Sequence, residues 1–293
     1  MRNNFGKWIN EKANQDNKII LLVGDIGFGI FDEFQKNFPS RFINCGIAEQ
    51  NMIGTAAGLA AKGFKPYVYT IIPFLLYRPF DFVRNLIFHQ KLNVKLVGVG
   101  SGLAYDNLGF THYGIEDLNL ISSLPNNKIF LPYSPKSLLT ILEDTYKVSH
   151  PSYIRLFKGG ENELTPQKKF KNFDLIENID NFCIITHGYM CNIAIEINDF
   201  LFSKYKKKGS IIVIKDNQFK IKNLNLKKYK KIVLLEEAVY PGIFAKIRDT
   251  LEYKNTLSMY IDVNKIDKFY KRKNLLKKLG ISKEKISKFI FSL

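Results

Sequence analysis

Residues 42–63 read FINCGIAEQNMIGTAAGLAAKG, which predicts a short strand, a glycine turn and a helix of small and apolar residues. The carboxylate of Glu49 falls in the first turn of that helix, where free N–H groups and the helix dipole favour an anion. Small residues let a helix pack closely, and Gly63 suits a left-handed C-cap. We therefore expect a buried helix. Burial would raise the pKa of Glu49, whereas the helix end would lower it, so its carboxyl group could share a proton with a ligand. The alternative is that Glu49 only caps the helix.

Short apolar runs alternate with helical stretches through the first half of the chain. Strands separated by helices predict a mostly parallel sheet covered on both faces, which defines an α/β fold. The predicted strands are residues 19–24, 65–71, 94–100, 128–133 and 153–157, and the predicted helices are about 4–15, 48–62, 75–91, 115–123 and 135–148.

A break in this pattern divides the chain. Glycine, proline and charge replace periodicity in GGENELTPQKKFKNF, so we predict a linker at residues 161–174. Residues 1–160 would form one domain and residues 175–293 a smaller one of the same mostly parallel, helix-covered kind. The second domain resumes the alternation with FCIITHG, YMCNIAIEINDFLFSKY, SIIVIK, KIVLLEE, GIFAKIRDTL and LSMYID.

The composition is that of a globular protein, with 46% hydrophobic and 24% charged residues in a chain of 293. No apolar run is long enough to span a bilayer, and residues 1–15 lack the apolar core of a secretory signal. We therefore expect a cytoplasmic protein without a membrane partner. Three cysteines without CxxC or Cys/His spacing fit a reducing compartment and indicate no metal site in this chain.

The net charge of +17 would attract phosphates, nucleic acid or acidic partners. The lysines gather late in the chain, in KYKKK, KNLNLKKYKK and KFYKRKNLLKK, without the interleaved aromatic residues of a nucleic-acid groove. We therefore expect a solvated basic surface. A nucleic-acid-binding protein is the non-enzymatic alternative, and a sugar phosphate or nucleotide-linked sugar would also suit the charge.

The stretch RFINCGIAEQNMIGTAAGLAAKGFKPYVY resembles the pyrimidine-binding domain of transketolases and related thiamine diphosphate enzymes. The resemblance implies that Glu49 hydrogen-bonds the aminopyrimidine ring of the coenzyme, favours its imino tautomer and so promotes formation of the ylide. In IIPFLLYRPFDFVRN, Phe74 matches an aromatic residue that lies against this ring, although a core phenylalanine would look the same. Glu49 is thus expected to be catalytic, and both residues to bind the coenzyme.

Two further loops resemble substrate-facing segments of the family. In LGFTHYGIEDLNLISSLPN, His112 matches a histidine that faces the donor ketose and the thiazolium, and its ordinary pKa near neutrality suits a proton shuttle. In LLVGDIGFGIFDEF, Asp25 stands at a strand end, where α/β proteins bind ligands, although a turn role stays open. We expect His112 to be catalytic and both residues to contact substrate.

The segment YIRLFKGG matches a place where the family often has an arginine that grips a substrate phosphate. Lys158 falls there with Arg155 nearby, so we expect substrate contacts from them, although a lysine lacks the bidentate fork of arginine. Two departures lie on the donor side. Gly100 stands where transketolases carry a substrate-facing histidine and Leu108 where they carry an aspartate, which places ordinary pentose phosphate substrates in question.

The resemblance extends to VLLEEAVYPGIFAKI, which is similar to the C-terminal domain of the family. The domain that binds the diphosphate and a divalent metal has no counterpart here, so the resemblance implies the C-terminal subunit of a split transketolase. An N-terminal partner subunit would supply the metal (Mg or Ca) site within a heterotetramer. The expected reaction transfers a two-carbon ketol unit from a ketose to an aldose. The alternative enzyme is the beta subunit of a 2-oxoacid dehydrogenase.

Overall fold

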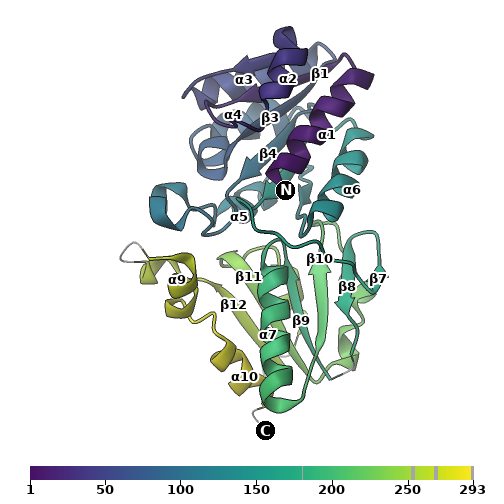
Figure 1. Ribbon diagram of the computed structural model, residues 1–293, viewed down its shortest axis with the longest axis vertical. Helices are drawn as coiled ribbons and strands as arrows, with labels where there is room; N and C mark the ends of the chain where they lie inside the picture. Colours follow the sequence, from purple (N-terminus) through teal and green to yellow (C-terminus); the bar gives the residue numbers. More distant parts are fainter. Residues whose placement is uncertain (180, 252–254, 267–269, 292–293) are drawn as a thin grey trace.

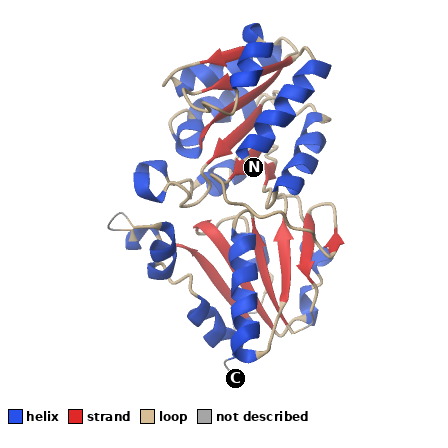
Figure 2. Ribbon diagram, viewed as in Figure 1, coloured by secondary structure: helices blue, strands red, loops and turns tan. Residues whose placement is uncertain are grey.

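The structure is a computed structural model of residues 1–293, described for all residues except 180, 252–254, 267–269 and 292–293. Two six-stranded sheets lie one above the other along the longest axis, each flanked by helices (Figures 1 and 2). The upper sheet is formed by the N-terminal part of the chain and the lower by the C-terminal part. The predicted α/β fold with two mostly parallel sheets is confirmed.

The upper sheet pairs only parallel strands, in the order β2-β1-β3-β4-β6-β5. Its strands are β1 (Ile19–Val23), β2 (Phe42–Asn44), β3 (Lys65–Ile71), β4 (Lys95–Val99), β5 (Ile129–Phe130) and β6 (Ser152–Leu156). Strands β1, β4 and β6 are buried along their whole length, because helices cover both faces of a parallel sheet.

The helices of this part are α1 (Arg2–Gln15), α2 (Asp32–Asn37), α3 (Glu49–Ala61), α4 (Phe80–Phe82), α5 (Asp117–Ser122) and α6 (Pro135–Tyr146). Helix α6 begins at a capping box of Ser134 and Ser137 with Pro135 in its first turn. The helix predicted at 75–91 is interrupted, because wider π-helical turns, η2 (Pro73–Tyr77) and η3 (Val83–Phe88), flank α4.

Helix α3 is buried on one face only, which corrects the expectation of a wholly buried helix. Met52, Ile53 and Ala56 are fully buried against the core. Gly58 and Ala61 are exposed, and a Cβ atom placed on Gly58 would meet no atom within 4 Å. The small residues thus leave a smooth outer face that the described part of the chain does not cover.

The lower sheet has the order β12-β11-β9-β10-β8-β7. Its strands are β7 (Lys168–Lys169), β8 (Phe173–Glu177), β9 (Phe182–His187), β10 (Ser210–Ile214), β11 (Lys231–Val239) and β12 (Thr256–Ile261). Strands β9 to β12 pair in parallel, and β7 and β8 form an antiparallel edge. Residues 168–169 and 173–174 of the expected linker therefore contribute to this sheet, whereas the domain limits themselves stay a prediction.

The helices around the lower sheet are α7 (Met190–Tyr205), α8 (Ala245–Arg248), α9 (Arg272–Lys278) and α10 (Lys283–Phe291). Helices α7 and α8 were predicted from the sequence. For the segment that forms α9 and α10, the sequence predicted only a lysine-rich surface. Leu275, Leu276 and Ile286 are buried there, so the lysines alternate with an apolar face that packs on the lower sheet. No helix in the described residues is long and apolar enough to cross a membrane.

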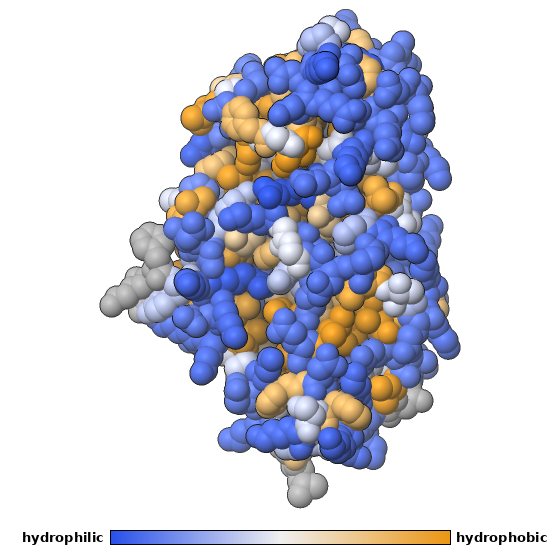
Figure 3. Space-filling model, viewed as in Figure 1, coloured by the Kyte–Doolittle hydropathy of each residue, from blue (hydrophilic) through white to orange (hydrophobic). Residues whose placement is uncertain are grey.

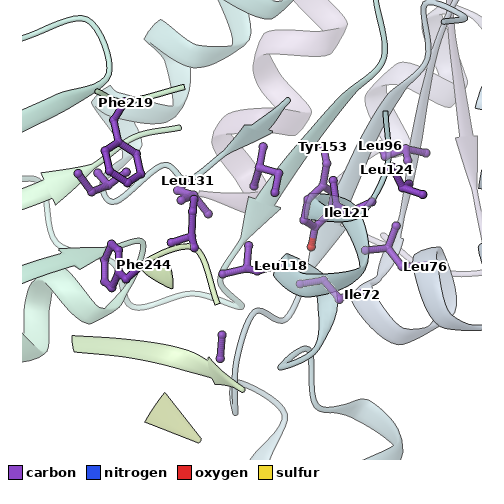
Figure 4. Packing of buried hydrophobic residues seen from close by; sticks show 14 of the residues in the cluster. Ile72, Leu76, Leu96, Leu118, Ile121, Leu124, Leu131, Tyr153, Phe219 and Phe244 are labelled. Atoms are coloured by element: carbon purple, nitrogen blue, oxygen red, sulfur yellow. The ribbon is translucent and has the colours of Figure 1, made fainter. Parts of the chain in front are cut away.

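The two parts share a continuous apolar core. Figure 4 shows Leu118, Leu131 and Tyr153 of the upper part in the same cluster as Phe219 and Phe244 of the lower part. Main-chain hydrogen bonds also cross the junction, from Leu131 N to the Lys215 carbonyl at 2.7 Å and from Val239 N to the Ile115 carbonyl at 2.9 Å. The junction is therefore packed like a protein interior. This packing holds the loops of the upper part that face the junction in one position relative to the lower part.

Candidate active site

The predicted site residues, apart from Arg155, lie at the carboxyl edge of the upper sheet. Asp25 follows β1, Glu49 follows β2, Phe74 follows β3, and Lys158 follows β6. His112 lies in the long loop after β4. Because neighbouring parallel strands all end at the same edge, residues far apart in sequence are brought together there.

The Glu49 carboxylate is 8% exposed and begins α3. Arg78, which the sequence motifs do not indicate, donates a hydrogen bond from Nη1 to Glu49 Oε1 at 2.7 Å. The Arg78 guanidinium carbon also lies 4.2 Å from the ring centroid of Phe74. Its place four residues after Phe74 in a helical segment was the available signal, because such pairs share a face. A flat cation thus bridges the carboxylate and the aromatic ring.

The imidazole of His112 completes this group. Its ring meets the edge of the Phe74 ring, with centroids 5.1 Å apart and planes at 75°. Thr111 Oγ1 lies 2.9 Å from His112 Nδ1 and shares a hydrogen bond with it. Partial burial, and then the nearby charge of Arg78, lower the pKa of His112. The imidazole is therefore held neutral near pH 7, in the form that can accept a proton.

Tyr105 connects the histidine to the predicted phosphate-binding lysine. The ring centroid of Tyr105 lies 6.3 Å from that of His112, and Lys158 Nζ lies 4.8 Å from the Tyr105 ring centroid. Gly100 has a φ of +87°, and a Cβ atom there would come within 2.2 Å of the Tyr105 ring. Tyr105, which the motifs also leave out, therefore fills the space beside the position where transketolases are expected to carry a histidine.

Asp25 lies outside this group in a tight arrangement of its own. It is exposed with a left-handed φ of 51°, and Asn44 Nδ2 donates to its Oδ1 at 3.1 Å. The Asn44 Oδ1 atom accepts in return from the main-chain N–H groups of Asp25 and Gly46, at 3.1 and 3.0 Å. This network ties the end of β1 to the turn before α3 and favours the turn role, while the substrate contact of Asp25 stays a prediction.

Arg155 lies inside the molecule and not at the edge with Lys158. It is 5% exposed, and its Nε and Nη2 donate to the two Asp117 carboxylate oxygens at 2.7 and 3.2 Å. Nη2 also donates to the carbonyls of Gly114 and Glu237, at 2.8 and 3.2 Å. A substrate phosphate would have to displace these partners, so the geometry favours a structural role over the predicted substrate contact.

The loops around the site expose large apolar side chains. Phe28 and Ile47 are each 78% exposed and Phe110 is 54% exposed, and these residues stand within three positions of Asp25, Glu49 and His112. The face drawn in Figure 3 is mostly hydrophilic, with separate apolar patches. Exposed apolar groups at a site rim are typical of a surface that another molecule covers. In the described residues, no group of three or more His, Cys, Asp or Glu side chains could hold a metal ion.

Residues 1–160 match the family described as transketolase, pyrimidine binding domain. The chain therefore belongs to the transketolase family. It is 32% identical over 275 residues to 1-deoxy-D-xylulose-5-phosphate synthase from Clostridium acetobutylicum, which covers 88% of this chain and 42% of that protein. The chain thus spans less than half the length of this relative.

Other relatives are closer in length. The chain is 32% identical over 157 residues to a putative transketolase C-terminal section from Methanocaldococcus jannaschii, covering 53% of this chain and 50% of that protein. A solved structure described as split gene transketolase, inactive beta4 tetramer, superposes with a TM-score of 0.79 at 26% identity over 99% of this chain and 96% of that one. Transketolase from Campylobacter jejuni superposes with a TM-score of 0.83 at 18% identity over 100% of this chain and 46% of that one, which supports the fold alone.

Proposed function

We propose that this chain is the C-terminal subunit of a transketolase-like enzyme that uses thiamine diphosphate to transfer a two-carbon ketol unit from a ketose to an aldose. The arrangement of Glu49, Phe74 and His112 around Arg78 carries the proposal. It places an acid, an aromatic platform and a neutral imidazole side by side at the ligand-binding edge of a parallel sheet. The likeness of almost the whole chain to a split-gene transketolase chain supports the subunit assignment.

The residues present fit the aminopyrimidine end of the coenzyme. The bridge from Glu49 to the Phe74 face is made by the guanidinium of Arg78, a flat, nitrogen-rich cation that is half exposed. An aminopyrimidine is also a flat ring with N–H donors, so the same carboxylate and ring can receive it once Arg78 moves aside. When bound, thiamine diphosphate supplies a thiazolium carbon acid whose conjugate base adds to carbonyl groups.

Each residue then has one task. Glu49 holds a proton at a pyrimidine ring nitrogen, which requires the near-complete burial that α3 provides. Phe74 holds the ring flat. His112, neutral near pH 7, exchanges a proton with a hydroxyl or carbonyl oxygen of the sugar. Lys158 attracts a phosphate on the substrate as a point charge.

The proposal includes an N-terminal partner subunit that binds the diphosphate and a divalent metal, in a cytoplasmic heterotetramer. The exposed Phe28, Ile47 and Phe110 around the site would be covered by that partner. The bare outer face of α3, with Gly58 and Ala61, offers a second flat contact surface. The relative described as a putative transketolase C-terminal section supports this arrangement.

The test is co-expression with the subunit encoded beside this chain, followed by coenzyme binding and ketose-to-aldose transfer assays. Glu49→Gln keeps the shape but removes the acid, so we expect turnover to fall by roughly 10²–10⁴-fold. Glu11→Gln, an exposed change on α1, is the matched control and should leave turnover unchanged. Unchanged turnover in Glu49→Gln would overturn the role of this residue.

The assay also separates the alternatives. Formation of 1-deoxy-D-xylulose 5-phosphate would instead favour a synthase of the kind named in the Clostridium acetobutylicum relative. A requirement for a lipoyl acceptor protein would assign the chain to a 2-oxoacid dehydrogenase. Transfer by this chain without a partner would contradict the split-subunit proposal.

A further inference from the structure

A second cleft lies at the junction of the two parts and has a volume of about 770 Å³. A volume of this size is in the range of small-molecule binding sites, roughly 300–1,000 Å³. Its upper wall comes from the segment around α5 and its lower wall from the loops after β10 and β11. The lining residues that could contact a ligand include Lys91, Lys128, His150, Phe219, Ile243 and Lys246.

The charged side chains on the described lining of the cleft are all positive. Lys91, Lys128 and Lys246 line it, and none of the described lining residues is an aspartate or a glutamate. Among the residues that the structure describes, these three lysines form no ion pair. Two lie on the upper part and one on the lower. Like charges that converge on a concave surface concentrate a positive potential, which an anion would neutralise.

His150, which lines the cleft, carries a ring nitrogen whose hydrogen-bonding capacity is unused in the described part of the protein. Its Nδ1 lies 3.1 Å from the Pro151 carbonyl and therefore carries a hydrogen, since a carbonyl can only accept. Its Nε2 is buried and has no hydrogen-bond partner in the described part of the protein. Burial, and then the charges of Lys128 and Lys95, lower the pKa of His150. A bound anion would reverse the charge effect and let Nε2 become a donor.

The walls of the cleft are held in place by amide side chains. Asn119 donates to the Tyr240 carbonyl at 3.2 Å and accepts from Gly242 N at 2.9 Å. Asn217 accepts from Ile129 N at 3.1 Å and donates to Asn127. These contacts join the two parts across the cleft. The site is therefore already formed, so a ligand would not have to order its walls.

The cleft is separate from the candidate active site. Lys128 and His150 stand just before β5 and β6, at the amino edge of the upper sheet, whereas Lys158 follows β6 at the opposite edge. For the lower sheet the relation is reversed, because Asn217 and Pro241 follow β10 and β11. The cleft thus occupies the carboxyl edge of the lower sheet, where open α/β sheets bind ligands.

We propose that this cleft is a second binding site, for a small phosphorylated organic anion. The phosphate would be held by the lysines and by His150, and the organic part would lie against the apolar surface of Phe219 and Ile243. Because both parts of the chain contribute, an occupied cleft would fasten them together and raise the thermal stability.

The test uses the full chain at low salt with pyrophosphate and glucose 6-phosphate as probes, measured by calorimetry and by thermal unfolding. The triple variant Lys91→Gln/Lys128→Gln/Lys246→Gln removes the cleft charges. Its matched control, Lys7→Gln/Lys36→Gln/Lys207→Gln, removes the same net charge from exposed positions elsewhere. We expect the cleft variant to weaken glucose 6-phosphate binding by about tenfold or more and the control to change it less than about twofold.

A second measurement locates the ligand. The imidazole C–H signal of His150 in NMR spectra is assigned by its loss in His150→Gln. When pyrophosphate is present, this signal should titrate at higher pH in the wild type and in Lys158→Gln. In the cleft variant, pyrophosphate should not change the titration. Equal weakening in both triple variants would show only general attraction to a basic protein and would overturn the proposal. So would the absence of binding at millimolar concentrations, or a His150 signal that does not respond.

Discussion

Arg155 Nε donates to Asp117 Oδ2 at 2.7 Å, and this ion pair is almost wholly buried where the two parts of the chain meet. The hydroxyl of Tyr153 donates to the same Asp117 oxygen at 2.6 Å, and Arg155 also reaches the main chain of Glu237 in the lower part. Asp117 begins α5, directly after the loop that carries His112. The pair therefore holds the candidate active site to the lower part.

Breaking this pair should be costly. We expect Asp117→Ala to lower the free energy of unfolding by about 3–5 kcal/mol, because it leaves a buried guanidinium without a counter-charge. Urea unfolding followed by circular dichroism measures this. The exposed Asp144→Ala should change stability by less than about 0.5 kcal/mol. The double variant Asp117→Leu/Arg155→Met should be more stable than Asp117→Ala, and equal or greater loss in the double variant would contradict this account.

The pKa of His112 should depend on Arg78. Burial and the Arg78 charge both lower it, so we expect Arg78→Ala to raise the pKa of His112, as followed by the imidazole C–H signal in NMR. Arg84→Ala on the same helical stretch is the control and should leave the pKa of His112 unchanged. If the pKa of His112 stays the same in Arg78→Ala, the Arg78 charge does not act on the imidazole in solution.

The conformation of the loop after β4 should depend on Gly100. A Cβ atom there would collide with the Tyr105 ring, and the φ of +87° disfavours any L side chain. We expect Gly100→Ala to cost about 1–3 kcal/mol of stability. Tyr105→Ala in the same chain should recover part of this loss, measured by a double-mutant cycle. No recovery would mean that the backbone conformation alone carries the cost.

The buried Lys95 should make stability pH-dependent. Burial, and then the charges of Lys128 and Lys65, lower its pKa to about 7, although Nζ donates to the carbonyls of Val148 and His150 at 2.9 and 2.8 Å. Between about pH 7 and the ordinary lysine pKa near 10.4, the unfolded chain binds more protons than the folded one, so this group makes stability rise with pH.

Lys95→Met should therefore reduce the slope of unfolding free energy against pH above pH 7, by up to about 1.4 kcal/mol per pH unit. Urea unfolding at a series of pH values measures the slope. Lys91→Met, at an exposed position, is the control and should keep the wild-type slope. Identical slopes in all three proteins would show that Lys95 remains protonated when folded.

Much of the fold could be predicted because it depends on local patterns. Apolar runs located β1 to β6 and β9 to β12, and the loss of pattern after Gly160 begins between the two sheets. The two-residue β7 and the edge strand β8 were missed, because they lie in or directly after the charged, glycine- and proline-containing segment that carries no strand pattern. Helices α9 and α10 were missed because closely spaced lysines obscured their apolar face.

Only part of the candidate site could be predicted from the sequence. The order of strand, glycine and small-residue helix singled out Glu49, and the loops singled out Phe74 and His112. The motifs did not indicate Arg78 or Tyr105, because an arginine and a tyrosine are common on any surface and their roles come from contacts across the chain. Only the four-residue spacing from Phe74 pointed to Arg78. The substrate-binding roles of Asp25 and Lys158 stay predictions.

The sequence by itself determined the alternation of strands and helices, and hence which loops share an edge, because backbone periodicity and burial are coupled locally. Only the tertiary structure decided that Arg155 is enclosed by Asp117 and Glu237, that Arg78 lies on Phe74 and Glu49, and that three lysines converge on a second cleft. Those relationships depend on distances between segments far apart in the chain, which packing sets and residue order does not record.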